Sequence, residues 1–150
     1  MRLAVGSDER THLTDAVVEE LERRGHRVTL FGPLAGQPLQ WVDVAQAVAQ
    51  EVAAGRADQG VLFCWTGTGV SMAANKVPGV RAALVQDAET ARGARRWNDA
   101  NVLCLSLRAT PEVVAREILD AWFSAEPDES ERENIEKVKA MDARTARPAS

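Results

Sequence analysis

The chain contains little cysteine and little histidine, with two residues of each among its 150. Two cysteines are too few for the disulfide framework of a small secreted domain. Cys64 and Cys104 are far apart in the sequence and have no histidines at metal-ligand spacing. The sequence therefore predicts reduced thiols and no structural metal.

An excess of positive charge and a long hydrophobic run are also missing. The formal net charge is −4 and the basic residues are scattered, which argues against a nucleic-acid partner. No apolar run reaches the length of a membrane span. Residues 1–5 lead directly into a strand-like segment without the hydrophobic region of a signal peptide. We expect a cytoplasmic protein with no nucleic-acid or membrane partner.

The chain is instead built from short apolar runs that alternate with amphipathic stretches. Its 150 residues, 45% of them hydrophobic, are enough for one full core. The short runs are rich in Val and Leu and predict five strands, at residues 2–6, 27–31, 60–64, 81–85 and 101–105.

Helical patterns fill the gaps between these strands. Residues 11–24 and 41–54 repeat apolar side chains at helical spacing, and the glycines that follow, Gly25 and Gly55, are typical of C-caps. Thr110 and Pro111 indicate a further helix, with a capping hydroxyl and a proline at its first position. The alternation predicts an α/β fold: a three-layer αβα sandwich around a five-stranded parallel, doubly wound, Rossmann-like sheet.

Cys64 stands at the carboxyl end of a predicted strand, the edge where such sheets bind ligands. A Gly/Thr/Ser-rich loop and a short helix follow it. The unpaired N–H groups at a helix start bind anions, and a thiolate beside them suits proton abstraction, because the negative charge formed is stabilised. The alternative interpretation is a glycine turn with Cys64 as a small core residue. Cys104 lies inside a strand and is predicted to be a core residue.

The last 25 residues differ in character from the rest. Residues 126–133 are strongly charged, with Asp128 and Glu131 placed as a capping box, and the helix that follows has a narrow apolar stripe at Ile135, Val138 and Met141. We predict an αβα domain over residues 1–125 and a tail helix over 126–150 that packs on a partner subunit. The alternative is a solvated helix ending in a disordered 147–150 segment.

Four segments carry a resemblance to a known family. They are Gly6-Ser7-Asp8, the run from Cys64 to Gly69 with Ser71 and residues 73–76, residues 79–84, and residues 98–103. Their order and spacing are similar to those of the ribose-5-phosphate isomerase B family, which includes galactose-6-phosphate isomerase subunits. The match runs from Gly60 to Arg108 without a gap and extends weakly over nearly the whole chain.

The resemblance implies an αβα sandwich that forms a homodimer or a dimer of dimers, with active sites at the subunit interface. It also implies cofactor-free aldose–ketose isomerisation of a sugar or sugar phosphate through an enediolate. In that family the residue at the position of Cys64 moves the proton, the threonine at the position of Thr66 assists ring opening, and backbone amides over residues 67–71 stabilise the enediolate. Arg108 matches a family arginine after the fifth strand.

The sequence also departs from the family pattern. Asp8-Glu9 replaces Asp-His, and Trp97-Asn98 replaces His-Asn, so the ring-opening histidine is missing. The two phosphate-binding arginines of the tail fall on Ser130 and Asn134, and Glu131 takes the place of a histidine. Asp8 is the better candidate for the missing proton transfer, with Glu9 as the alternative. Arg10, Arg95 and Arg96 either supply a new anion site or form a solvated positive face.

Three tryptophans stand at pocket positions of the family: Trp65, Trp41 (just before Asp43) and Trp97. Aromatic walls suit a sugar or another compact substrate. Trp41 is equally consistent with a core position in its helix. The predicted site comprises the catalytic residues Cys64, Thr66 and Asp8 and the substrate-binding residues Glu9, Asp43, Trp65, Gly67, Thr68, Gly69, Val70, Ser71, Trp97, Asn98 and Arg108.

These features together predict an isomerase of carbohydrate metabolism that keeps the enediolate machinery but has altered specificity. Its expected substrate is a short, acyclic or unphosphorylated sugar. The conservative alternative is an ordinary pentose-phosphate isomerase with a rebuilt site. The alternative from another class is a non-catalytic sugar-binding subunit of a hetero-oligomer.

Overall fold

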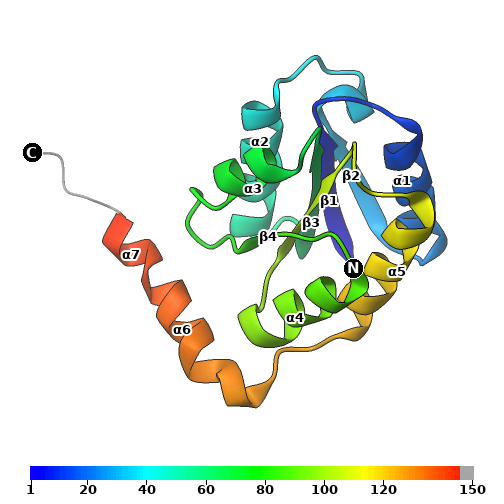
Figure 1. Cartoon of the computed structure of the whole chain (residues 1–150). Coiled ribbons are helices and arrows are strands. Elements are labelled where there is room, and N and C mark those ends of the chain that lie inside the picture. Colours follow the sequence, from blue (N-terminus) through cyan, green and yellow to red (C-terminus); the bar gives the residue numbers. More distant parts are fainter. Residues whose placement is uncertain (146–150) are drawn as a thin grey trace, which may run out of the picture.

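The computed structural model describes residues 1–145 and contains one five-stranded sheet with helices on both faces (Figure 1). The sheet order is β2-β1-β3-β5-β4, and every neighbouring pair is parallel. The strands are β1 (Arg2–Ser7), β2 (Arg27–Phe31), β3 (Gln59–Cys64), β4 (Ala82–Leu84) and β5 (Val102–Ser106). The predicted α/β fold and all five predicted strands are confirmed.

β4 is shorter than predicted, and side chains add hydrogen bonds to its backbone pairing with β5. The amide of Asn75 brackets Ala82, accepting its N–H at 2.8 Å and donating to its carbonyl at 2.9 Å. Asn101 accepts the N–H of Arg81 at 2.7 Å. Asparagine side chains therefore complete the hydrogen bonds of this edge strand.

The helices are α1 (His12–Arg23), α2 (Trp41–Ala53), α3 (Thr68–Ala74), α4 (Ala88–Asn98), α5 (Glu112–Ser124), α6 (Arg132–Ala140) and α7 (Asp142–Thr145), with 3₁₀ turns η1 (Gly32–Ala35) and η2 (Glu129–Glu131). Gly25 and Gly55 have φ of 88° and 75° directly after the caps of α1 and α2, which confirms the predicted helix ends. The prediction for α5 is wrong in detail. The helix begins at Glu112, so Pro111 is its N-cap, and no side chain caps it.

The helices form two layers that bury alternate side chains of the same strands. α1, α4 and α5 cover one face, where Val5 and Phe63 point, and α2 and α3 cover the other, where Leu62 and Cys64 point. Gly6 allows α2 to approach closely, because a Cβ there would lie 2.6 Å from Val44 Cγ1. All five strands end at one edge, at the top of Figure 1, which we call the carboxyl edge.

The tail leaves α5 at the opposite, amino edge and projects from the body as α6 and α7 (Figure 1). Its attachment to α4 is polar: Arg96 Nη2 lies 2.9 Å from Asp128 Oδ2, and Asp128 N–H donates to the Arg96 carbonyl at 2.7 Å. Of the predicted stripe, only Ile135 is buried, while Val138 and Met141 are exposed.

The predicted capping box does not form. Asp128 accepts the N–H of Ser130 at 3.0 Å, but the Glu131 carboxylate accepts from the Asn134 amide at 2.9 Å and does not reach back. A 3₁₀ turn therefore replaces the first turn of the expected helix. The 147–150 segment lies outside the described residues.

Candidate functional site

Cys64 is the last residue of β3 and lies opposite Ser106 of β5. Its side chain is 6% exposed and points toward α2 and α3. The thiol is therefore packed on one side by the core and placed at the carboxyl edge on the other. Cys104 is fully buried, as predicted, and burial raises the pKa of its thiol far above the ordinary value.

The loop after Cys64 depends on Gly67. This residue has φ of 78°, and a Cβ on it would lie 2.5 Å from Leu84 Cδ1 and 3.0 Å from the carbonyl carbon of Leu105. Only glycine combines that left-handed conformation with such close packing on β5. α3 begins at the next residue, and the N–H groups of Thr68, Gly69 and Val70 have no carbonyl four residues back inside the helix.

Ser106 is a structural part of the edge that the sequence did not reveal. Its hydroxyl donates to the Trp65 carbonyl at 2.9 Å and accepts the N–H of Ala109 at 3.1 Å. The N–H groups of Leu107 and Arg108 donate to the carbonyls of Cys64 and Trp65 at 2.9 and 3.1 Å. The only signal was a serine at the end of an apolar strand.

Asp8 and Glu9 follow β1 at the same edge. The buried Ser7 hydroxyl donates to the Glu9 carbonyl at 2.6 Å and accepts the Glu9 N–H at 3.2 Å, which fixes this turn. Partial burial raises the pKa of Asp8 above its ordinary value, the neighbouring Glu9 charge adds to this, and a backbone hydrogen bond opposes it. The surroundings of Asp8 thus favour the protonated form of its carboxyl group.

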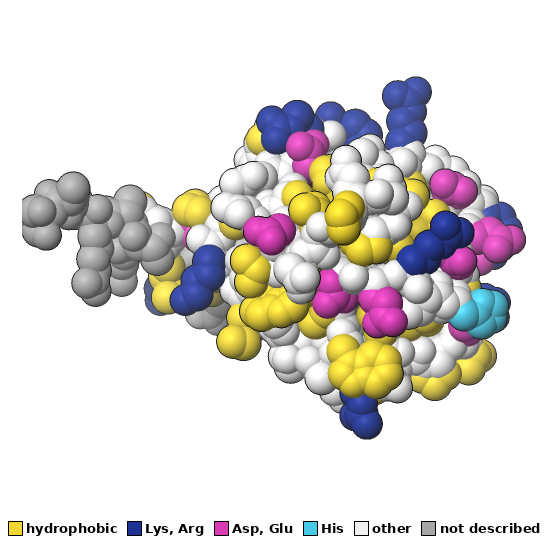
Figure 2. All heavy atoms as spheres, turned by 90° about the horizontal axis from the view of Figure 1, so that it is seen from above, with side chains coloured by type: hydrophobic (Ala, Val, Ile, Leu, Met, Phe, Trp, Pro, Cys, Tyr) yellow, Lys and Arg dark blue, Asp and Glu magenta, His cyan; other side chains and the backbone are white. Residues whose placement is uncertain are grey.

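Other predicted residues gather around the same loop. The hydroxyls of Thr66 and Thr68 lie 2.8 Å apart, and Asp43 is in the first turn of α2. Figure 2 looks down on this edge and shows acidic side chains (magenta) among patches of hydrophobic ones (yellow). The exposed apolar side chains include Trp41, Trp65 and Met72.

Trp41 is not a core residue, because its side chain is 40% exposed. Its ring covers Gly69: a Cβ on this glycine would lie 2.9 Å from Trp41 Cε3. On its other side Trp41 lines a groove of about 420 Å³ between α2 and α3, together with Val42, Met72 and Val77. Of the two alternatives for Trp41, the core position is therefore wrong, and the pocket position stays a prediction.

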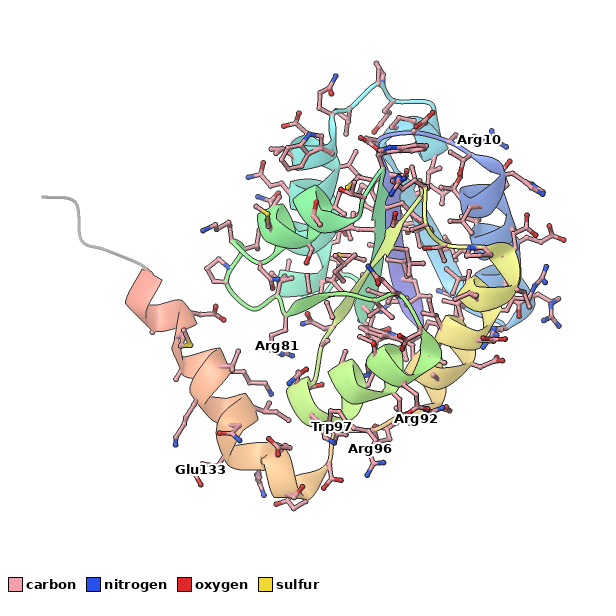
Figure 3. All side chains as sticks on the ribbon, viewed as in Figure 1. Arg10, Arg81, Arg92, Arg96, Trp97 and Glu133 are labelled. Carbon is pink, nitrogen blue, oxygen red and sulfur yellow. The ribbon has the colours of Figure 1, made fainter. Side chains whose placement is uncertain are left out.

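The structure does not bring Trp97 and Asn98 to Cys64 within one chain. Both end α4, which runs away from the carboxyl edge, and Trp97 lies at the bottom of Figure 3 while Arg10 lies near the top. The Trp97 ring packs on its own helix, where a Cβ on Gly93 would lie 2.7 Å from Trp97 Cζ3. The predicted residues thus fall into two groups at opposite edges of the sheet.

Most of the candidate arginines are engaged. Arg10 pairs with Asp15 at 2.9 Å, and Arg96 with Asp128. Arg95 is buried, donates to the Ala100 carbonyl at 2.6 Å and lies over the Trp122 ring, so the expectation that it is solvated or binds an anion is wrong. Arg108 is exposed and forms no ion pair with any described residue.

Neither histidine lies beside Cys64. His12 is 90% exposed and its Nε2 lies 2.6 Å from Glu112 Oε1. His26 packs on Phe123, contacts the chain's N-terminus and is partly buried. In the described part of the chain, no three His, Cys, Asp or Glu side chains are grouped as metal ligands. The described helices include none with the length and apolar character needed to cross a membrane.

Comparison with known proteins gives a consistent assignment. Residues 3–141 match the family model described as Ribose/Galactose Isomerase. The chain is 38% identical over 126 residues to galactose-6-phosphate isomerase subunit LacB of Clostridium acetobutylicum, covering 84% of this chain and 72% of that protein. It is 35% identical to D-erythrulose-4-phosphate isomerase of Pectobacterium atrosepticum, covering 84% of each.

A solved structure agrees with these relatives. Ribose-5-phosphate isomerase B of Clostridium thermocellum superimposes with a TM-score of 0.89 at 33% identity, covering 97% of this chain and all of that one. The chain therefore belongs to the ribose/galactose isomerase family and is an aldose–ketose isomerase of the sugar-phosphate class.

Proposed function

We propose that this isomerase acts on a short sugar phosphate that stays acyclic, with a four-carbon chain as the preferred length, and that Cys64 is the base. The observation that supports this most is the combination at the carboxyl edge. Cys64 ends β3, and four residues later α3 begins with N–H groups that have no partner inside the helix, while each histidine of the chain contacts other residues.

The proposed reaction moves hydrogen without a redox partner. The Cys64 thiolate takes the proton from C2 of the aldose, the C–H electrons form the C1–C2 double bond, and the carbonyl oxygen becomes an oxyanion. The N–H groups of Thr68 to Val70 stabilise that charge. Asp8 carries a proton between the two oxygens, and the thiol returns its proton to C1 to give the ketose.

The substrate class follows from ring chemistry. A pentose phosphate is mostly cyclic and must be opened by an acid–base group before isomerisation, whereas a tetrose phosphorylated on O4 lacks the hydroxyl needed to close a five-membered ring. A site without a histidine beside its thiol suits the second kind of substrate. The similarity to D-erythrulose-4-phosphate isomerase supports a four-carbon chain, and the unpaired Arg108 is available for the phosphate.

We also propose that a second copy of the chain completes the site. Trp97 and Asn98 lie at the amino edge, close to the point where the projecting tail is attached to α4 by Arg96 and Asp128. They reach a Cys64 only if they belong to another subunit. The tail residues Ser130, Glu131 and Asn134 would arrive with them. A homodimer with two shared sites is the simplest such assembly.

The test is proton exchange followed by NMR in deuterated water. The protein is incubated with erythrose 4-phosphate, with unphosphorylated tetroses and with ribose 5-phosphate. We expect exchange mainly on erythrose 4-phosphate, abolished in Cys64→Ala and retained in the matched control Cys104→Ala. Exchange that survives in Cys64→Ala would exclude the proposed base. Exchange on ribose 5-phosphate alone would favour the alternative of an ordinary pentose-phosphate isomerase. No exchange on any of the sugars would favour the alternative of a non-catalytic sugar-binding subunit.

A further inference from the structure

Trp65 follows Cys64 directly and is 59% exposed. No aromatic or cation–π contact of its ring occurs within the described residues. A single exposed apolar side chain is ordinary on a protein surface and needs no explanation by itself. What distinguishes Trp65 is its place directly after Cys64 and its backbone hydrogen bond to Arg108.

The backbone of Trp65 is held on both sides. Its carbonyl accepts the Ser106 hydroxyl at 2.9 Å and the Arg108 N–H at 3.1 Å. The preceding carbonyl, of Cys64, accepts the Leu107 N–H at 2.9 Å. These hydrogen bonds join the backbones of Cys64, Trp65 and Arg108, and the side chains of Trp65 and Arg108 are both exposed.

We propose that Trp65 sets the length of sugar that the site accepts. This inference rests on the proposed function, in which the reacting carbons lie at Cys64 and the phosphate at Arg108. The substrate must then span the gap beside the indole. The ring fills the space that an additional carbon and its hydroxyl would take, and its face covers the C–H side of a four-carbon chain.

The size of the effect follows from the chemistry of pockets. A change of one carbon unit in a well-fitted pocket alters the preference between substrates by about tenfold or more. Replacing the indole with hydrogen, in Trp65→Gly, should therefore change the preference between the four-carbon and five-carbon compounds. It should not lower the activity on both to the same extent. That preference separates a specificity role from a structural one.

The experiment compares wild type, Trp65→Phe and Trp65→Gly, with Val113→Ala as a control for removal of an exposed apolar side chain on α5. Binding of 4-phosphoerythronate and 5-phosphoribonate, which are sugar acids that cannot isomerise, is measured by calorimetry. We expect wild type and Val113→Ala to prefer the four-carbon acid. The preference should fall by about tenfold in Trp65→Gly, with Trp65→Phe between them.

Exchange on erythrose 4-phosphate and ribose 5-phosphate should shift in the same direction in these variants. Four outcomes would each overturn the role of Trp65. Two concern the wild type: a preference for the five-carbon acid, or no binding of either acid. The other two concern Trp65→Gly: an unchanged ratio of the two affinities, or an equal weakening of both. Because this measurement is of binding, it is independent of whether Cys64 is the base, which is decided by exchange in Cys64→Ala.

Discussion

The indole of Trp41 lies directly over Gly69 in the first turn of α3, so close that a methyl group on the glycine would be 2.9 Å from Cε3 of the ring. An aromatic side chain of α2 thus covers the backbone that we propose as the oxyanion site. The contact leaves no room for a side chain at Gly69 unless the ring moves.

Gly69→Ala should impair catalysis more than folding. The added methyl group displaces the Trp41 ring, and we expect kcat/KM to fall by about tenfold because the oxyanion geometry changes. The free energy of unfolding should change by less than about 1 kcal/mol, because the ring is partly exposed and can move outward. Recovery in Gly69→Ala combined with Trp41→Ala would confirm the steric cause. A double variant as impaired as the single one would contradict it.

Gly67→Ala should destabilise the fold more than Gly25→Ala does. Both glycines have positive φ, 78° and 88°, so each alanine carries backbone strain of about 1 kcal/mol or more. Only at Gly67 does the new Cβ also contact the backbone of β5, at 3.0 Å from the Leu105 carbonyl carbon. A Cβ added at Gly25 would have no such neighbour within 4 Å. We expect losses of about 1 kcal/mol at Gly25 and about 3 kcal/mol at Gly67 in urea unfolding. Equal losses would show that the packing on β5 contributes nothing.

Asp8→Asn should lower activity and raise stability at neutral pH. The pKa of Asp8 is raised in the folded state, so that state binds more protons than the unfolded one between the two pKa values, and stability falls as pH rises through that window. The uncharged amide of the Asp8→Asn variant cannot titrate, so the loss of stability with rising pH disappears. Activity should decrease by about a hundredfold if Asp8 moves the proton between the oxygens.

Asp58→Asn is the matched control, because the pKa of Asp58 is shifted in the opposite direction to that of Asp8. Hydrogen bonds and the charge of Arg2 lower the pKa of Asp58, so its contribution is present above the unfolded pKa and is lost as pH falls. This variant should be less stable than wild type at neutral pH and fully active. Unfolding curves recorded from acid to neutral pH distinguish the two variants. A loss of stability in Asp8→Asn at neutral pH would contradict the assignment of Asp8 as a partly buried, proton-holding group.

Mixing two inactive variants should restore activity if the site is shared between subunits. Cys64→Ala removes one half of each site, and the double variant Trp97→Ala/Asn98→Ala removes the other. After subunit exchange, about a quarter of the sites combine two intact halves, so the mixture should regain about a quarter of wild-type activity. The control is each variant incubated alone under the same conditions. A mixture no more active than its components would place the whole site within one chain.

The sequence was sufficient for the fold because both faces of the sheet are covered. Strands such as β3 and β5 read as continuous apolar runs, and the glycines after α1 and α2 marked the helix ends correctly. β4 was overestimated in length, and its additional hydrogen bonds to Asn75 and Asn101 involve side chains that no strand pattern includes.

The candidate site was predictable only in part. The residues around Cys64 follow one another in the chain, so their common place at the strand end could be inferred. Ser106 acts through the register between β3 and β5, which is a tertiary property. Arg95 is buried because the Ala100 carbonyl and the Trp122 ring meet it there, and charge alone predicted a solvated or anion-binding side chain.

The bonds from β5 to the Cys64 loop also fix when that loop can form. Leu107 and Arg108 donate to the carbonyls of Cys64 and Trp65, and Gly67 packs on Leu105. A nascent chain that has emerged from the ribosome only as far as residue 100 contains β1 to β4 but lacks Leu105, Leu107 and Arg108. The Cys64 thiol therefore gains its final surroundings late in synthesis, when β5 enters the sheet between β3 and β4, which are made before it.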